Sequence, residues 1–152
     1  FYTANLINCF VLQNINMKKT TEKENYLKAF YKFEEKSKEI SVTALSEYFK
    51  VSKSTVSNMI KKLVKMGYVN TQPYKPILLT DAGRATAIEV ISKHRLIELY
   101  LVNKMHFALD EVHDIAEEIE HIENSKFFNR MREILGDTNL DPHGSVIPKT
   151  KY

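Results

Sequence analysis

Apolar residues recur at helical spacing through most of the first half of the chain. One such stretch covers residues 20–36 and a second covers 41–50. A short turn over 50–52 leads into a third stretch, 53–66, which Gly67 ends. Spacing of this kind indicates helices with one buried face, and glycine is typical just beyond a helix C-terminus. Two short helices joined by a tight turn predict a helix-turn-helix unit.

Two short apolar runs, 68–72 and 77–80, follow and predict a strand pair joined by the loop 73–76. The segment 17–80 is therefore expected to be a winged helix-turn-helix domain. Hydroxyls and amides near the start of its second helix suit base edges, and lysines suit phosphates. The expected DNA-binding residues are Ser52, Lys53, Ser54, Thr55, Ser57, Asn58, Lys61, Lys62, Tyr74 and Lys75.

The second half reads as three helices. The first runs from Asp81, a candidate N-cap, to about residue 104, and the second starts near residue 109. The third follows residue 124 or 125 and ends at residue 136. Segment 81–148 is thus predicted to be a helical domain, followed by a tail over 149–152, and the fold class is mainly α.

The two ends of the chain have unusual composition. Residues 1–16 carry no Lys, Arg, Asp or Glu, and we interpret them as an extension without function rather than as a packed strand or helix. The segment 141–148 is a loop bounded by proline and containing glycine. A chain that stops soon after such a loop is expected to have lost a following domain.

Charge divides the chain into two parts. Although the net charge is only +3, residues 17–80 hold 13 basic against 6 acidic side chains, and residues 81–136 hold 7 against 11. A basic half followed by an acidic half suggests one part for a polyanion and another for cations or a partner. The single Cys9 excludes an internal disulfide framework and a cysteine-based zinc finger, and it fits a reducing, cytoplasmic location.

Histidines and glutamates recur at i, i+4 spacing in the acidic half, which places them on shared helix faces. Imidazole and carboxylate donors without thiolate suit Mn²⁺, Fe²⁺, Co²⁺ or Zn²⁺. The alternatives are a structural His–Glu contact on the long helix and an ordinary charged stripe on the next one. The candidate metal ligands on these two helices are His94, Glu98, His113, Glu117, Glu120 and His121.

From about residue 22 to residue 148 the chain resembles the metal-dependent repressors of the diphtheria toxin repressor and manganese transport regulator family. The matching motifs, in chain order, are His94-Arg-Leu-Ile-Glu98, Glu111-Val-His113-Asp, Glu120-His121 and Asp141-Pro-His-Gly-Ser-Val-Ile-Pro148. The resemblance implies a winged-helix domain, a helical metal-binding and dimerisation domain, a divalent corepressor metal and a palindromic operator. It also implies one metal site from a first-helix residue with Glu117, Glu120 and His121, and another from His94, Glu98 and His113.

Two positions depart from the family pattern. Asn25 stands where members have Met or Asp, so this ligand brings a carbonyl oxygen but no charge. Glu117 follows manganese-type members, whereas His113 follows the iron-type pattern, which leaves Mn²⁺ and Fe²⁺ both open, with Zn²⁺ or Co²⁺ as substitutes in vitro. Many members carry a further SH3-like domain after the Asp-Pro-His-Gly loop, and the 152 residues contain no counterpart of it.

The function expected from this combination is metal-responsive transcriptional repression. The hypothesis is that metal joins the two helices of the acidic half to the first helix. This would hold the two DNA-binding domains of a dimer at the separation of two operator half-sites. The expected partners are double-stranded operator DNA and a second copy of the chain, without a membrane or a small-molecule substrate. The main alternative is a metal-independent winged-helix regulator. A hydrolytic enzyme is disfavoured because no nucleophile motif or phosphate loop is present.

Overall fold

The structure is a computed structural model that describes residues 20–150, and the chain divides into two compact units between Gly83 and Arg84. Residues 1–19 and 151–152 lie outside the described part, and with them the expected extension over 1–16. The prediction of a mainly α fold with a winged-helix part and a helical part is confirmed. No helix among the described residues is long and apolar enough to cross a membrane.

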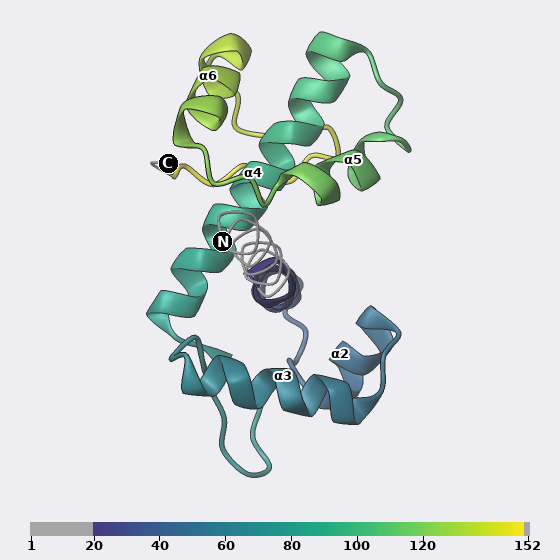
Figure 1. Cartoon of the computed structure of the whole chain (residues 1–152). Helices are drawn as coiled ribbons and strands as arrows, with labels where there is room; N and C mark the ends of the chain where they lie inside the picture. The colour runs from purple at the N-terminus through teal and green to yellow at the C-terminus, as the bar shows by residue number, and fades with distance from the viewer. Residues whose placement is uncertain (1–19, 151–152) are drawn as a thin grey trace, which may run out of the picture. The chain divides into compact units, whose positions relative to one another are not determined.

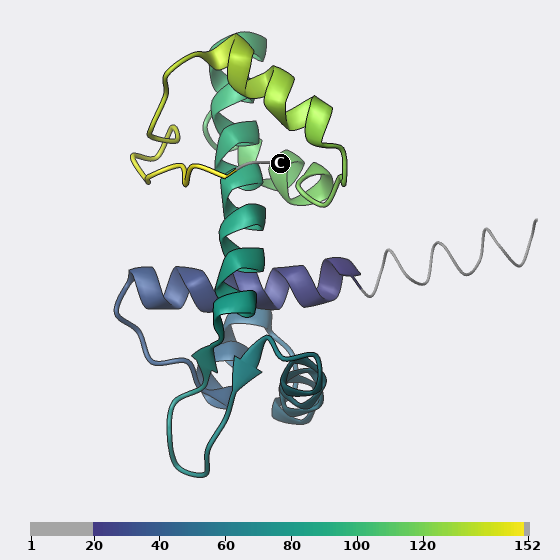
Figure 2. The ribbon, with the colours of Figure 1, turned by 90° about the vertical axis from the view of Figure 1, so that its left-hand side faces the viewer.

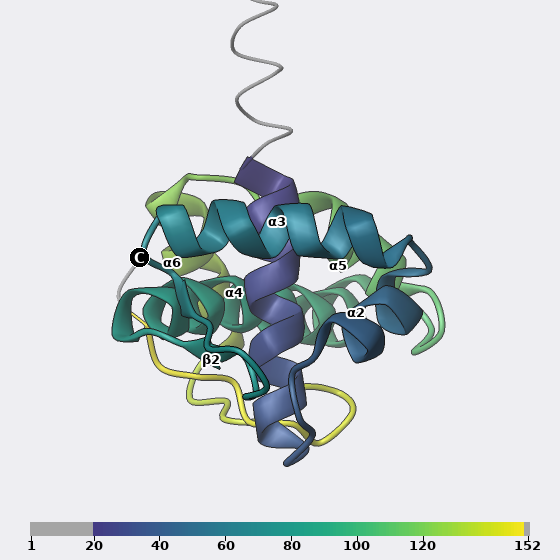
Figure 3. The ribbon, with the colours of Figure 1, turned by 90° about the horizontal axis from the view of Figure 1, so that it is seen from below.

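The first unit begins, within the described residues, with a helix over 20–35, followed by α2 (Val42–Phe49) and α3 (Lys53–Lys65). Figure 3 shows these three helices together, with helix 20–35 in purple. The rings of Tyr26 and Phe49 stack with their centroids 4.3 Å apart and so join helix 20–35 to α2. Leu45, Val56 and Leu63 are fully buried and form the contact between α2 and α3.

Serine side chains start both short helices. The Ser41 hydroxyl accepts from the Ala44 backbone N–H at 3.2 Å, and the Ser52 hydroxyl accepts from that of Thr55 at 3.1 Å. These bonds satisfy backbone N–H groups that the first helical turn leaves without partners. Lys50 ends α2 in a left-handed conformation, which makes the tight turn before α3. Part of each apolar helix face lies at the surface, because Tyr48 is 45% exposed and Val64 is 40% exposed.

The wing is a two-stranded antiparallel sheet of β1 (Val69–Asn70) and β2 (Leu78–Leu79), visible with its connecting loop in Figure 2. Val69 pairs with Leu79, and both are buried, whereas Asn70 and Leu78 face outward. The connecting residues 71–76 are exposed. The predicted strand pair is therefore correct, although each strand is shorter than expected.

α4 (Asp81–Met105) starts in the first unit and continues through the second. The Thr80 hydroxyl accepts from the Gly83 N–H at 3.1 Å, so Thr80 caps this helix and the prediction of Asp81 as N-cap was wrong. A Cβ on Gly83 would collide with the Tyr68 carbonyl oxygen. The start of α4 therefore packs against the backbone of Tyr68, between α3 and β1, at a distance that only glycine permits.

The second unit packs α5 (Val112–Ile119) and α6 (Ser125–Leu135) around the rest of α4, as Figure 1 shows. Asn124, one of the two predicted positions before α6, caps the helix by accepting from the Phe127 N–H at 3.1 Å, and Gly136 ends it as predicted. The α5 helix is shorter than expected, because residues 109–111 form a turn. One core cluster of this unit contains the fully buried residues Leu96, Ile97, Val112, Ala116 and Phe128.

Candidate metal centre

A glutamate and two histidines meet where α4 and α5 pack together. His94 and Glu98 lie one turn apart on α4, and His94 Nε2 is 3.0 Å from Glu98 Oε1. His113 of α5 places its Nδ1 3.2 Å from Glu98 Oε1 and 3.2 Å from His94 Nε2. His94 and Glu98 are buried, whereas half of the His113 side chain is exposed. The predicted trio His94, Glu98 and His113 therefore comes together.

The other nitrogen of His94 faces a second acidic group. His94 Nδ1 is 2.6 Å from Glu120 Oε2, and Glu120 is completely buried at the C-terminal end of α5. His94, Glu117 and Glu120 each offer a ligand atom within 4.8 Å of the other two. His94 thus belongs to two groups of possible metal ligands at once.

The hydrogen bond to Glu120 assigns the roles of the two His94 nitrogens. A carboxylate accepts hydrogen bonds but cannot donate one, so Nδ1 carries the proton in this contact. The other nitrogen, Nε2, faces Glu98 and His113. It donates to Glu98 when it carries a proton, and it can bind a metal through its lone pair when it does not. A histidine that binds a metal through one nitrogen and donates to a carboxylate through the other is the usual supported metal ligand.

The Glu98 carboxyl group is ionised in this setting. Burial alone raises its pKa, but hydrogen bonds from His94 and His113, together with the nearby positive charge of His94, outweigh burial and lower the pKa to about 2. Glu98 is therefore a carboxylate throughout the physiological pH range. A buried carboxylate needs a hydrogen-bonding or positively charged partner, and these histidines provide one.

The donor atoms fit a divalent transition metal. Two atoms bound to one ion at about 2.1 Å lie at most about 4.2 Å apart. The nitrogen–oxygen distances around Glu98 Oε1 satisfy that limit. The donors are nitrogen and carboxylate oxygen, the set favoured by Mn²⁺, Fe²⁺, Co²⁺ and Zn²⁺.

Three further residues complete the comparison with the predicted ligands. His121 Nε2 lies 3.3 Å from Glu120 Oε1, and His121 follows α5 rather than lying on its surface. Asn25 lies on helix 20–35, and its Oδ1 is buried without a hydrogen-bond partner among residues 20–150. His143, which the sequence reasoning did not include, places Nε2 3.9 Å from Glu98 Oε1. Its only sequence signal is a histidine within the Pro- and Gly-containing loop 141–148.

The residues expected to bind DNA are largely exposed at the start of α3 and in the wing. Ser52, the α3 cap, also shares hydrogen bonds with the Ser54 and Thr55 hydroxyls at 2.7 and 2.8 Å. Ser57 is partly buried, unlike its exposed neighbours. The exposed members of the set are Ser52, Lys53, Ser54, Thr55, Asn58, Lys61, Lys62, Tyr74 and Lys75.

Two family models match the chain in the same order as its two units. Residues 18–77 match the N-terminal DNA-binding domain of iron-dependent repressors, and residues 80–149 match the metal-binding and dimerisation domain of iron-dependent repressors. The matched ranges enclose the exposed α3 surface and both groups of candidate metal ligands, respectively.

Relatives and solved structures agree with these matches. The diphtheria toxin repressor of Corynebacterium efficiens is 33% identical over 125 residues, which cover 82% of this chain and 54% of that protein. An uncharacterised HTH-type transcriptional regulator of Methanocaldococcus jannaschii is 33% identical over 72% of this chain and 88% of its own length.

Among solved structures, the manganese regulator SloR is 36% identical, with a TM-score of 0.76, over 86% of this chain and 60% of that one. A manganese-dependent transcriptional repressor in complex with manganese is 38% identical, with a TM-score of 0.77, over 84% and 58%. The chain spans about half the length of the diphtheria toxin repressors that it matches.

Proposed function

This chain belongs to the iron-dependent repressor family, and on that premise we propose that it is a divalent-metal-responsive transcriptional repressor. The observation that carries the proposal is the buried His94, whose two nitrogens face two groups of metal-ligand side chains. Carboxylates buried on both sides of one histidine need positive charge to offset their burial, and a bound divalent cation supplies it.

We propose two metal sites from these donors. One would be held by His94, Glu98 and His113, and the other by Glu117, Glu120 and His121, the set that the family resemblance implies. In the structure, Glu117 and Glu120 lie together with His94. A bound divalent cation supplies positive charge that offsets the clustered carboxylates. Relatives are named as iron-dependent and manganese-dependent repressors, which supports Fe²⁺ or Mn²⁺ as the metal, with Zn²⁺ or Co²⁺ as substitutes.

The exposed start of α3 is the proposed DNA-reading surface. Its three hydroxyls hold one another by hydrogen bonds, so they are ordered before any DNA arrives. Lys53, Lys61 and Lys62 are exposed on the same helix and suit phosphate contacts. A helix N-terminus that carries small polar side chains can enter the major groove and present them to base edges.

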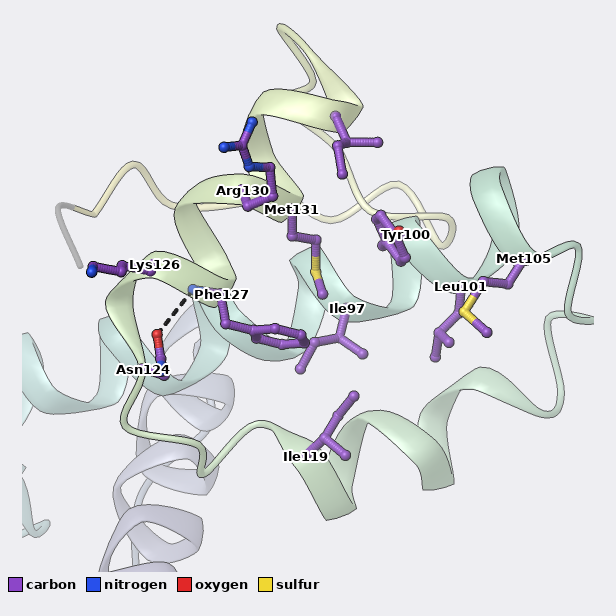
Figure 4. A pocket seen from close by; sticks show the side chains of 11 residues that line it. Ile97, Tyr100, Leu101, Met105, Ile119, Asn124, Lys126, Phe127, Arg130 and Met131 are labelled. Carbon is purple, nitrogen blue, oxygen red and sulfur yellow. Dashed lines mark hydrogen bonds between the residues drawn. The ribbon is translucent and has the colours of Figure 1, made fainter.

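The proposed dimer surface is an apolar hollow between α4, α5 and α6, shown in Figure 4. Its volume is about 520 Å³, and Ile97, Ile119, Phe127 and Met131 point into it. Phe127 and Ile134 on its rim are 41% and 44% exposed, and Met105 is 54% exposed. Several large apolar side chains gathered on one exposed face are typical of a protein interface.

If a metal binds the DNA-binding state of the protein more tightly than the other state, metal binding raises the affinity of the protein for DNA. DNA then raises the affinity of the protein for the metal by the same factor. The test is fluorescence anisotropy with an operator duplex selected from a random-sequence library in the presence of Mn²⁺. We expect tight binding with Mn²⁺ or anaerobic Fe²⁺, and loss of it with EDTA. Weak binding to unrelated duplexes that falls steeply with salt is expected in both conditions.

The alternative of a metal-independent winged-helix regulator predicts equal operator binding with metal and with EDTA. That result would reject the proposed function. The family consists of transcriptional repressors, so we propose no enzymatic activity for the chain, and we propose that it acts in the cytoplasm.

A further inference from the structure

The loop after α6 is hydrogen-bonded to α4 by α4 side chains spaced three residues apart. The Ser92 hydroxyl donates to the Pro148 carbonyl at 2.7 Å, and Arg95 Nη1 donates to the Val146 carbonyl at 2.6 Å. Residues three apart on a helix lie on the same face. Glu98 is the next residue in that series, and His143 of the loop lies opposite it.

The turn that carries His143 is organised by a buried aspartate. One oxygen of Asp141 accepts from the backbone N–H groups of His143 and Ser145 at 2.9 and 2.8 Å. Its other oxygen lies 3.6 Å from Arg95 Nε, and Asp141 is only 7% exposed. Gly144 takes the left-handed conformation, with φ +83°, that closes the turn. The backbone at His143 is therefore set by several contacts rather than left to a mobile surface loop.

Three imidazole nitrogens from three separate segments surround one oxygen of Glu98. The distances to Glu98 Oε1 are 3.0 Å from His94 Nε2, 3.2 Å from His113 Nδ1 and 3.9 Å from His143 Nε2. All three are shorter than the maximum of about 4.2 Å for two atoms bound to a single ion at about 2.1 Å. Donor atoms of His94, Glu98 and His113 also lie within 4.8 Å of one another, and His143 stands outside that group, so its half-exposed ring must turn toward the other histidines to share an ion with them. A histidine that packed only on the loop surface would not need to direct a nitrogen at this carboxylate.

We propose that His143 is a fourth protein ligand of the metal site formed by His94, Glu98 and His113. The inference rests on the proposed function, because it requires that this site binds a divalent metal. Three imidazoles and one carboxylate suit Zn²⁺, Co²⁺, Fe²⁺ or Mn²⁺. A metal held at this site would join the loop 141–148 to α4 and α5.

Co²⁺ is the probe, because its visible ligand-field absorption reports the atoms bound to it. Calorimetric and spectroscopic titrations of the full chain compare the parent protein with E98Q, and the difference between the two isolates this site. In H143A we expect Co²⁺ affinity at this site to fall at least about tenfold, together with a changed ligand-field spectrum. H143Q, which restores an oxygen donor of similar reach, is expected to recover part of the affinity.

The matched control is S145A, which alters the same turn two residues away and keeps the backbone N–H that donates to Asp141. It is expected to leave both affinity and spectrum unchanged. Circular dichroism of each metal-free variant checks that the fold is retained. A purely structural role for His143 would lower stability without altering the spectrum of bound Co²⁺.

The outcomes separate the two levels of inference. If E98Q loses one equivalent of Co²⁺ while H143A keeps the parent affinity and spectrum, the site exists and the role of His143 is wrong. If E98Q binds as much Co²⁺ as the parent, the site around Glu98 is itself wrong, and the role of His143 is overturned with it.

Discussion

Replacing Glu120 by Gln is expected to weaken both metal sites, although the sequence assigns Glu120 to only one. The carboxylate accepts from His94 Nδ1 at 2.6 Å and lies 3.3 Å from His121 Nε2 through its other oxygen. In the first site it orients a ligand, and in the second it is a ligand. Gln keeps the shape and one acceptor oxygen but loses the charge.

The magnitude follows from these two roles. Loss of a carboxylate that orients a metal-binding histidine costs about 10–100-fold in metal affinity, or about 1.4–2.7 kcal/mol. Loss of the charged ligand itself costs at least as much at the second site. Because the Gln oxygen still accepts from His94, metal-free stability is expected to change by less than about 1.5 kcal/mol.

The assay is calorimetric titration with Mn²⁺ and Co²⁺, followed by operator binding at saturating metal. The control is E118Q, a neighbouring exposed glutamate on α5 that belongs to neither ligand group. We expect E120Q to lose both high-affinity phases and metal-dependent operator binding while it keeps salt-sensitive binding to unrelated DNA. If only one phase weakens and the other matches E118Q, the link through His94 is refuted.

Further predictions concern DNA, the dimer and acid stability. Each of K53A, K61A and K62A is expected to reduce the slope of log affinity against log salt by about 0.9, as measured by anisotropy at several salt concentrations. F127D places a charge in the apolar hollow and is expected to yield monomers in sedimentation velocity, whereas N129D, at an exposed α6 position that does not line the hollow, is not. Although burial raises the pKa of Glu98, hydrogen bonding from His94 and His113 outweighs burial and lowers the folded-state pKa to about 2. The contribution of Glu98 to metal-free stability is therefore present above about pH 4.5 and is lost as the pH falls towards 2. Denaturant titrations over this pH range should show the loss in the parent and not in E98Q.

Predictions from local patterns were the most accurate. The start of α6 after residue 124 or 125 and its end at Gly136 were both predicted, because a helix end depends on side chains and backbone within one turn. The pairing of His94 with Glu98 was equally predictable from the sequence, since i, i+4 spacing is a property of one helix. The error at the start of α4 was of the same short range, because Thr80 and Asp81 are both good caps and only the observed bond to Gly83 distinguishes them.

The sequence by itself determined the order of helices, the wing, the family and the set of nitrogen and oxygen donors. Only the tertiary structure decided which donors meet. Glu120 lies on what reads as a charged surface stripe, yet it is fully buried against His94, because α5 ends at Ile119 and packs on α4 at that point. His143 reaches Glu98 because a buried aspartate shapes its turn and Arg95 holds the loop on α4. Contacts between segments distant in the chain depend on how whole faces pack, which spacing within a single element does not specify.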